Sequence, residues 1–456
     1  MSDKNLQDSI DEAIKESKDE IISFCQSLIQ QRSINPPGSE KAAAQSIVSK
    51  LQENEILINV QDYANDRGNI IATLLGSANG KKLLYNGHID VVPVPPGEKW
   101  KVDPFKGMLK QNKIWGRGTV DMKGNIAAMV MSAIILKRLQ VPLNGGLILN
   151  FVSDEEQGGA HGTKWCIETY PNLLKADATI IGEPTSYPGF PVVIMIGEKG
   201  ILWLEITVWG KSAHASVPMI GKNPISMMMQ ILQGIEQKLD YEVVPLYSLE
   251  QLKKMASDVF GAETFQRIYT EQEIIKGLFN ALVQLTHAET IIQAGEKENV
   301  IPERCTVLID FRLTPKHDPD VLLNKIKEVI TGLGPDFRIK DSEDDTRGRV
   351  LLKIRTNQAP SVMKNPNTRL LEIIREAHVE VFGKPTFSFL MPATSDARFF
   401  RNDNPSECKI ASICDNTVLF GGGDGTLAHA KNECLSVASL LQMTKIYALI
   451  AAKYLS

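Results

Sequence analysis

Apolar positions along the first 200 residues follow two alternating patterns. Short continuous apolar runs end in glycine or polar turns, which is typical of buried strands in an α/β sheet. These runs are Ile70–Leu75, Leu83–Tyr85, Leu147–Val152 and Ala178–Ile181. Between them, apolar residues recur every three or four positions at 5–31, 42–51 and 126–139, which predicts helices. The alternation of strands with helices predicts an α/β fold.

A different pattern begins after Ile196. Leu202–Trp209 alternates apolar residues with others, which predicts a half-buried strand. It opens a strand–helix–strand–strand–helix–strand order, as in a ferredoxin-like α+β layer, and residues 240–290 add helical spacing without chemistry that we can name. After this region the α/β pattern resumes, with helical spacing and a predicted strand at Cys408–Ile413. We therefore predict one domain of residues 1–197 plus 362–456, and a second domain of residues 198–361 inserted into it.

The composition excludes several functional classes. A chain of 456 residues is too long for one core, and a formal charge of −4 gives no electrostatic case for nucleic acid or an anionic membrane. The first twenty residues lack the apolar core of a signal peptide, and no apolar run is long enough to span a bilayer. The six cysteines show no CxxC spacing, which favours free thiols in a reducing compartment. We expect a cytoplasmic protein that binds neither membranes nor nucleic acid.

Histidine and acidic residues follow three of the predicted strands. They are His88 and Asp90 after one strand, Glu155 and Glu156 after another, and Glu183 after a third. Ligand sites in α/β sheets lie at the carboxyl ends of strands, so these residues point to one shared site. Neighbouring carboxylates repel each other unless a positive charge lies between them. The pattern therefore favours a metal site.

Single members of this set also have simpler explanations. His88 with Asp90 can form a surface hydrogen bond, and Asp121, in a glycine-containing loop ahead of a helix, can complement the helix dipole. Histidine and carboxylate donors without thiolates suit zinc, cobalt or manganese. With Asp121 and His429 the chain offers enough donors for two ions, and one acid is left to act as a base.

Six motifs carry a resemblance to a known family over nearly the whole chain. The motifs GHIDVVP, GRGTVDMKG, SDEEQGG, GEPT, GKSAHAS and HAKNE, in this order, resemble the dinuclear metallo-deacylases. That family includes acetylornithine deacetylase, succinyl-diaminopimelate desuccinylase, aminoacylase and glutamate carboxypeptidases. The resemblance implies a zinc-peptidase-like catalytic domain, a mixed sheet between helices, with an inserted ferredoxin-like lid that often serves for dimerisation.

The same resemblance implies a role for each site residue. The metal ligands would be His88 and Glu183 for one ion, Glu156 and His429 for the other, and Asp121 as the bridge between two divalent ions, zinc or else cobalt or manganese. Glu155 would be the general base that takes a proton from the bridging water and gives it to the amine. Asp90 would orient His88. In this family the bond after the bridging aspartate is cis, so we expect a cis Asp121–Met122 peptide.

Three residues of the predicted lid match positions that meet the substrate. His214 matches a histidine that stabilises the oxyanion, commonly from the partner subunit, although it can instead cap the helix that follows. Asn299 and Arg312 match substrate-contacting positions, and arginine suits a substrate carboxylate. A structural pair of Arg312 with Asp310 is the alternative. We expect a homodimer formed through the lid, although the segment near 240–290, which small members lack, leaves the assembly open.

The predicted activity is metal-dependent removal of an N-acyl group from an amino acid or related amine, as in acetylornithine deacetylase and succinyl-diaminopimelate desuccinylase. A dipeptidase or carboxypeptidase with the same dinuclear site is the alternative within this class. A non-catalytic relative that binds a ligand through the lid is the alternative from another class. The unliganded Glu155 among other acids argues against that last reading, because a binding module needs no such base.

Overall fold

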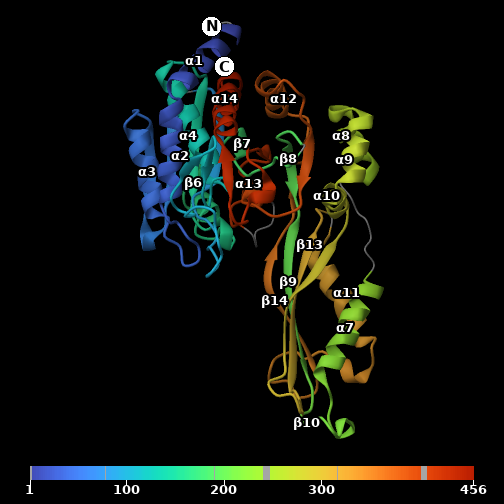
Figure 1. Cartoon of the computed structure of the whole chain (residues 1–456). Helices are drawn as coiled ribbons and strands as arrows, with labels where there is room; N and C mark the ends of the chain where they lie inside the picture. The colour runs from blue at the N-terminus through green and yellow to red at the C-terminus, as the bar shows by residue number, and fades with distance from the viewer. Residues whose placement is uncertain (1–2, 78, 189, 240–246, 316, 402–407) are drawn as a thin grey trace.

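The computed structural model describes residues 3–77, 79–188, 190–239, 247–315, 317–401 and 408–456, which form a large unit and a narrow small unit (Figure 1). A nine-stranded mixed sheet lies at the centre of the large unit, in the order β1-β2-β6-β3-β7-β17-β8-β15, with β16 paired to β8. Its strands are β1 (Leu57–Asp62), β2 (Asn69–Leu75), β3 (Lys81–His88), β6 (Gly145–Val152), β7 (Ala178–Ile181), β8 (Ile194–Glu198), β15 (Ser361–Val362), β16 (Ser388–Met391) and β17 (Thr417–Leu419).

Helices and a small second sheet surround this central sheet. The helices are α1 (Asp3–Glu16), α2 (Lys18–Gln30), α3 (Lys41–Gln52), α4 (Lys123–Arg138), α5 (Thr163–Thr169), α6 (Pro171–Leu174), α12 (Arg369–Phe382), α13 (Ala397–Arg401) and α14 (Val437–Tyr454). The small sheet contains β4 (Met108–Lys110), β5 (Lys113–Trp115) and β18 (Cys434–Ser436). Helix α4 is apolar on all sides and buried from Lys123 to Leu136, because the sheet, α2 and α14 enclose it.

Three neighbouring parallel strands position the candidate site. Strand β3 pairs in parallel with β6 on one side and with β7 on the other. Parallel strands place their carboxyl ends at the same edge of a sheet, and ligand sites lie beyond that edge. The residues that follow β3, β6 and β7 therefore meet, although the three strands are spread over about a hundred residues of sequence.

The small unit has the predicted ferredoxin-like arrangement. Its antiparallel sheet has the order β11-β13-β9-β14 and is packed against two helices. These elements are β9 (Gly200–Trp209), α7 (Pro224–Lys238), β11 (Thr286–Ala294), β13 (Arg304–Leu313), α11 (Pro319–Thr331) and β14 (Val350–Gln358). A two-stranded sheet of β10 (Ala213–His214) and β12 (Val300–Ile301) forms the far end, which we call the tip. Side chains of β9, β13 and both helices form a hydrophobic core separate from that of the large unit.

Three helices inside the predicted insertion pack against the large unit instead. They are α8 (Leu249–Phe260), α9 (Ala262–Glu271) and α10 (Glu273–Val283), and they lie beside β16 and β8 (Figure 1). Phe279 of α10 is fully buried, and its ring centroid lies 5.0 Å from that of Phe389 on β16. The buried Lys199 donates hydrogen bonds to the carbonyls of Ala281 and Gln284, at the end of α10, over 2.8 and 2.9 Å. The domain boundaries that we drew from the sequence remain a prediction.

Local features correct two further expectations. The single helix expected over residues 5–31 is two helices, because α1 ends at Glu16 and α2 begins at Lys18. The strand expected at Cys408–Ile413 is absent, and the sheet is joined instead by the fully buried β17. Among the residues that the structure describes, no helix has the length and apolar character needed to cross a membrane.

We predict that Phe279→Ala loosens α8–α10 from the large unit. Removal of this buried ring costs about 3–5 kcal/mol through lost burial and the cavity left behind. Hydrogen exchange followed by mass spectrometry should then show faster exchange in α8–α10 and β16. Phe337→Ala is the matched control, because Phe337 belongs to the core of the small unit, where its loss should raise exchange instead. Faster exchange confined to the sheet of the small unit in Phe279→Ala would contradict the prediction.

Candidate metal centre

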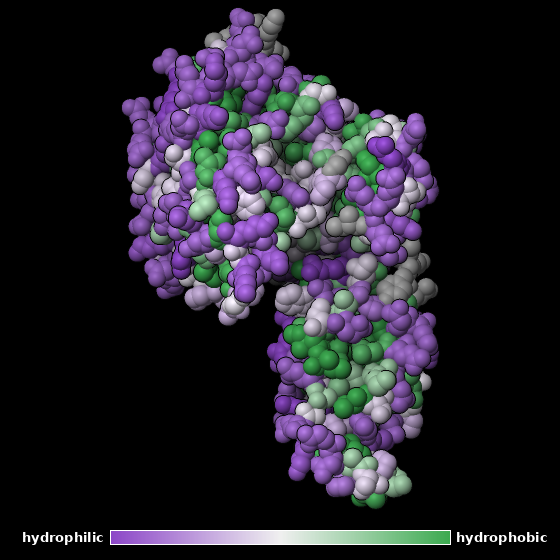
Figure 2. Space-filling view, in the orientation of Figure 1, coloured by the Kyte–Doolittle hydropathy of each residue, from purple (hydrophilic) through white to green (hydrophobic). Residues whose placement is uncertain are grey.

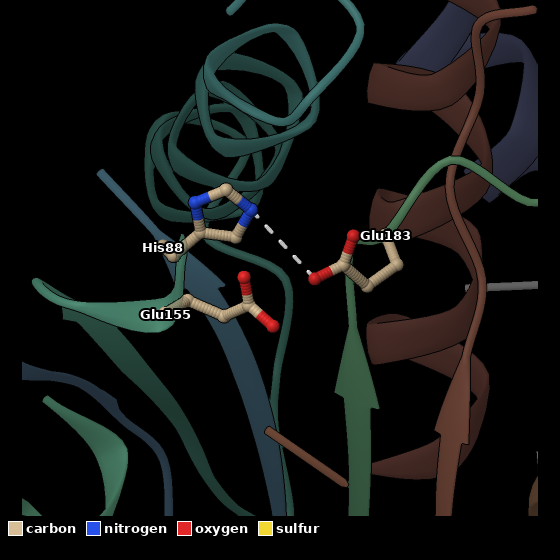
Figure 3. A group of neighbouring side chains, drawn as sticks. All are labelled: His88, Glu155 and Glu183. Atoms are coloured by element: carbon tan, nitrogen blue, oxygen red, sulfur yellow. Dashed lines mark ion pairs between the residues drawn. The ribbon is translucent and has the colours of Figure 1, made fainter. Parts of the chain in front are cut away.

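The ends of β3, β7 and β6 bring His88, Glu183 and Glu155 together. His88 is the last residue of β3, Glu183 follows β7 by two residues, and Glu155 follows β6 by three. The Nε2 atom of His88 lies 3.7 Å from Oε1 of Glu183. Both carboxylates point toward the imidazole ring of His88 (Figure 3). The sequence-predicted meeting of these three strand ends is therefore present in the fold.

Asp121 lies between two histidines that come from distant parts of the chain. Its Oδ1 atom is 3.0 Å from Nε2 of His88, and its Oδ2 atom is 3.1 Å from Nε2 of His429. The same Nε2 atom of His429 lies 3.0 Å from Oε2 of Glu156. Each oxygen of Asp121 therefore faces a different histidine, and the second histidine also faces Glu156. The Asp121–Met122 peptide is cis, as expected.

The donor atoms form two overlapping groups whose members lie within 4.8 Å of one another. One group is His88, Glu155 and Glu183, and the other is His88, Asp121 and Glu156. Imidazole nitrogen and carboxylate oxygen are the donors that zinc, cobalt and manganese accept in proteins. The donor set therefore fits divalent metal ions. Glu155, for which the resemblance implies the role of general base, belongs to the first of these donor groups as well.

Electrostatics in this group favour a bound cation. Burial raises the pKa of Glu183 to about 8, and the nearby charge of Asp121 adds to this effect. Burial also raises the pKa of Glu155 well above its usual value, against the opposing effect of His88. Hydrogen bonds that His429 donates to the carboxylates of Asp121 and Glu156 raise its pKa to about 11. The raised carboxyl pKa values show that negative charge is unfavourable here, and the raised imidazole pKa shows that positive charge is favourable. A bound cation would therefore stabilise this site.

Asp90 ties the end of β3 to the turn that carries the two glutamates. It is fully buried, and its Oδ1 atom lies 3.5 Å from Nδ1 of His88. Its two oxygens accept hydrogen bonds from the backbone N–H groups of Glu155 and Glu156 over 3.2 and 3.1 Å. Asn35 donates a further hydrogen bond of 2.9 Å. The contact with His88 fits the orienting role expected for Asp90, and the hold on the glutamate turn is an addition that the sequence did not suggest.

Two buried arginines that the sequence reasoning missed also contact this region. Arg398 of α13 donates hydrogen bonds of 2.7 Å to the carbonyls of Gly158 and Ser395, and so fastens the glutamate turn from the other side. Arg117 forms an ion pair of 2.9 Å with Glu433. Arg117 lies within the motif GRGTVDMKG, whereas Arg398 lies outside the six motifs, and an arginine in a loop is equally typical of solvated surface. The one available signal was the proximity of Arg117 to Asp121 in the sequence.

His214 and Asn299 lie far from this group within the same chain. Both are exposed at the tip of the small unit, where the carbonyl of Asn299 accepts a hydrogen bond of 2.9 Å from the N–H of Ala215. The ten residues of β9 separate the tip from the large unit by about 30 Å. The alternative role of His214 as a helix cap is wrong, because Asn223 caps α7 by accepting a hydrogen bond from the N–H of Ile225.

Arg312 lies at the opposite end of the small unit, next to the large unit. It forms the structural pair named as an alternative, since its Nε and Nη2 atoms donate to both oxygens of Asp310 over 2.8 and 2.9 Å. Its side chain is 29% exposed, so one face of the pair remains open to solvent. A contact with substrate stays a prediction.

Comparisons with known proteins agree with these observations. The chain is 27% identical to the succinyl-diaminopimelate desuccinylase of Rickettsia bellii (strain OSU 85-389) over 369 residues, which cover 80% of this chain and 79% of the relative. It is also 27% identical to the probable succinyl-diaminopimelate desuccinylase of Staphylococcus aureus (strain MSSA476) over 439 residues, covering 91% of this chain and 98% of the relative.

Solved structures share the fold. The M20 family metallo-carboxypeptidase Sso-CP2 of Sulfolobus solfataricus has a TM-score of 0.74 at 22% identity, with 95% of this chain and 99% of that chain covered. The di-peptidase Dug1p of Saccharomyces cerevisiae has a TM-score of 0.73 at 17% identity, with 100% and 99% covered. The YXEP protein of Bacillus subtilis, described as a dinuclear metal binding peptidase, has a TM-score of 0.63 at 17% identity, with 97% and 99% covered.

The model of peptidase family M20/M25/M40 matches residues 84–453, which is well over half of the sequence. The matched region begins within β3, ends within α14 and includes every candidate metal ligand. The family predicted from the six motifs is thereby confirmed. This chain is a hydrolase that acts on amide bonds, and it belongs to peptidase family M20/M25/M40.

Proposed function

We propose that this chain removes an N-acyl group from an amino acid or a related amine by metal-dependent hydrolysis. The observation that carries the proposal is the position of Asp121, which presents one carboxylate oxygen to His88 and the other to His429. A carboxylate placed in this way could be shared by two metal ions, as a two-metal hydrolytic site would use it. The names of the desuccinylase relatives support the N-acyl class of substrate.

The candidate ligands divide between two ions. We assign His88 and Glu183 to one ion, Glu156 and His429 to the other, and Asp121 to both. Zinc suits these donors, and cobalt or manganese would also suit them. Bound here, two divalent cations would polarise the carbonyl of the amide and lower the pKa of a water molecule.

Glu155 is the residue that we assign to proton transfer. It accepts a proton from the attacking water and returns it to the nitrogen of the leaving amine, so that the products are a carboxylate and an amine. Its carboxylate faces the ring of His88, and Asp90 and Arg398 hold the turn on which it lies (Figure 3). A fixed turn keeps the base at a constant distance from the reacting atoms, which is the condition for efficient proton transfer.

A substrate screen with controlled metal content tests the proposed function. We expect turnover of N-succinyl, N-acetyl or N-formyl amino acids, its loss after dialysis against a chelator, and its return with zinc, cobalt or manganese. The metal that restores the highest activity identifies the best cofactor in vitro. Cleavage of dipeptides alone would show that the deacylase proposal is wrong and that the dipeptidase or carboxypeptidase alternative holds. Activity that survives complete metal removal would contradict the two-metal site.

Glu155→Gln should lower kcat by about 10²–10⁴-fold, because the amide cannot accept the proton. Metal content, measured by elemental analysis, should stay at the wild-type value, since Glu155 is assigned no ligand role. Glu156→Gln is the matched neighbour and should lose metal as well as activity. Near-normal turnover in Glu155→Gln would refute the base assignment, and loss of one ion would make Glu155 a ligand.

We also infer a homodimer in which the small unit of one subunit serves the site of the other. Strand β11 is an edge strand of the sheet in the small unit, with Ile291 and Ile292 51% and 62% exposed. At the tip, Met219 and Ile220 are 80% and 58% exposed, and apolar atoms gather there on the surface (Figure 2). Exposed apolar groups on an unpaired strand edge favour association with a second chain. A partner subunit would bring His214 to a site that it cannot reach within its own chain.

Complementation of inactive variants tests this arrangement. His214→Ala should lower kcat by about 10²–10³-fold, the usual cost of losing an oxyanion donor. When it is mixed with Glu155→Gln and the subunits exchange, a heterodimer with one complete site should recover activity. Ser216→Ala, which removes the hydroxyl 2.7 Å from Nδ1 of His214, is the control and should retain activity. If mixing restores nothing although heterodimers form, His214 does not act from the partner.

The cysteines support a reducing compartment for this protein. All six are buried and unpaired in the described part of the chain. Reduced buried thiols are typical of cytoplasmic proteins, which is the location that we infer.

A further inference from the structure

A buried ion pair connects the loop of Asp121 with the loop of His429. Arg117 lies four residues before Asp121 and is 1% exposed, while Glu433 lies four residues after His429 and is fully buried. The Nη1 atom of Arg117 is 2.9 Å from Oε2 of Glu433. The indole of Trp100 covers the guanidinium, with 5.2 Å between Cζ and the ring centroid. Neither residue belongs to the donor groups that can hold a metal ion.

Glu433 holds the backbone of the loop that carries Asp121. Its Oε1 atom accepts hydrogen bonds from the N–H groups of Val120 and Asp121 over 2.8 and 3.2 Å. The carbonyl of Glu433 also accepts a hydrogen bond of 3.0 Å from the N–H of Gly116. The peptide that leads into the bridging aspartate is therefore fixed by an acid from the other loop.

Arg117 holds the backbone of the loop that carries His429. Its Nη2 atom donates to the carbonyl of His429 over 3.2 Å, and its Nη1 atom donates to the carbonyl of Ala430 over 3.1 Å. His429 adopts a positive φ of 60°, a conformation that L-residues adopt rarely and that needs support from its surroundings. The arginine of the Asp121 loop thus fixes the backbone of His429, and the acid of the His429 loop fixes the backbone of Asp121.

These contacts indicate that the ion pair of Arg117 and Glu433 provides positioning and not stability. A buried ion pair is weak evidence for stability, because taking both charges out of water offsets their attraction. Here the hydrogen bonds that remain to each partner go to backbone groups at or beside Asp121 and His429. We propose that Arg117 and Glu433 are positioning residues that set the distance between Asp121 and His429, and so the geometry of the metal ion between them; this rests on the proposed function.

The proposal predicts an effect on one of the two ions. His88 and Glu183 follow strands β3 and β7 directly, so the central sheet fixes them without help from Arg117 or Glu433. Glu156 is likewise held through its N–H by Asp90. Among the assigned metal ligands, only His429 and Asp121 have backbone groups that Arg117 or Glu433 holds. Disruption should therefore weaken the ion assigned to Glu156 and His429 more than the ion assigned to His88 and Glu183.

Metal titration of the full-length chain tests this. Zn²⁺ is titrated into metal-free wild type, Arg117→Met, Glu433→Gln and the double variant, with a chromophoric chelator as competitor. We expect two tight ions in wild type, and in each single variant one ion weakened by about 10–100-fold, as for other residues that orient metal ligands. The double variant should lose no more than either single variant, because the two residues act as a unit. The Co²⁺ absorption spectrum should change only for the weaker ion.

The matched control is Arg138→Met with Glu20→Gln. This pair lies in the same unit, at the far end of α4, with hydrogen bonds of 2.7 and 2.8 Å between guanidinium and carboxylate. Its loss should leave both metal affinities unchanged. Circular dichroism and thermal melting establish that each variant is folded. Where Arg117→Met does not fold, Arg117→Lys replaces it, because lysine keeps the charge but cannot reach Glu433 and both carbonyls together.

The outcomes separate this proposal from the proposed function. Two ions bound with wild-type affinity in the folded variants would overturn the positioning role and leave the two-metal hydrolase intact. Equal weakening of both ions would also overturn it, since that result indicates a general structural role. A wild-type chain that binds no divalent metal would overturn both proposals.

Discussion

The crowding of ionisable side chains beyond one edge of the sheet is the constraint on which the rest of this structure depends. His88 lies within a few ångströms of Glu183 and of Asp121 and Glu156, and these side chains are largely out of contact with water. Desolvation and mutual repulsion oppose such a group, so the fold must hold it in place by other means. The parallel pairing of β3 with β6 and β7 supplies part of that hold, because the hydrogen bonds of the sheet fix the strand ends.

The site is also held in place by buried side chains that connect one segment of the chain to the backbone of another. Asp90 links the end of β3 to the glutamate turn, Arg398 fastens that turn to α13, and the pair of Arg117 and Glu433 joins the two outer loops. Each of these groups uses a side chain of one segment to bind the backbone of another. Side chains of ligands can rotate, but a fixed backbone limits where they can go, which is how a site keeps its geometry while it is crowded with like charges.

The two kinds of support, strand pairing and buried side chains between segments, differ in how well they can be predicted from the sequence. An apolar run followed by an acid is a local pattern, and it correctly predicted β3, β6, β7 and the meeting of His88, Glu155 and Glu183. Arg117 and Glu433 are 316 positions apart, and nothing local distinguishes a buried pair from two solvated charges. The same limit applies to α8–α10. Their helical spacing was visible, but the core that Phe279 enters depends on contacts with β16, far along the chain.

The small unit is joined to the large unit through a junction that is held on two sides. Its first strand, β9, begins two residues after β8 ends. The buried Lys199 between them donates hydrogen bonds to carbonyls at the end of α10, which itself packs on the large unit. The junction is therefore braced on two sides, and the strands extend from it as a stiff layer. A stiff layer about 30 Å long presents Arg312 at one end and His214 at the other, at a separation that side-chain motion cannot close. The roles that we propose for these two residues at one amide substrate therefore require two chains, which is the physical basis of the proposed homodimer.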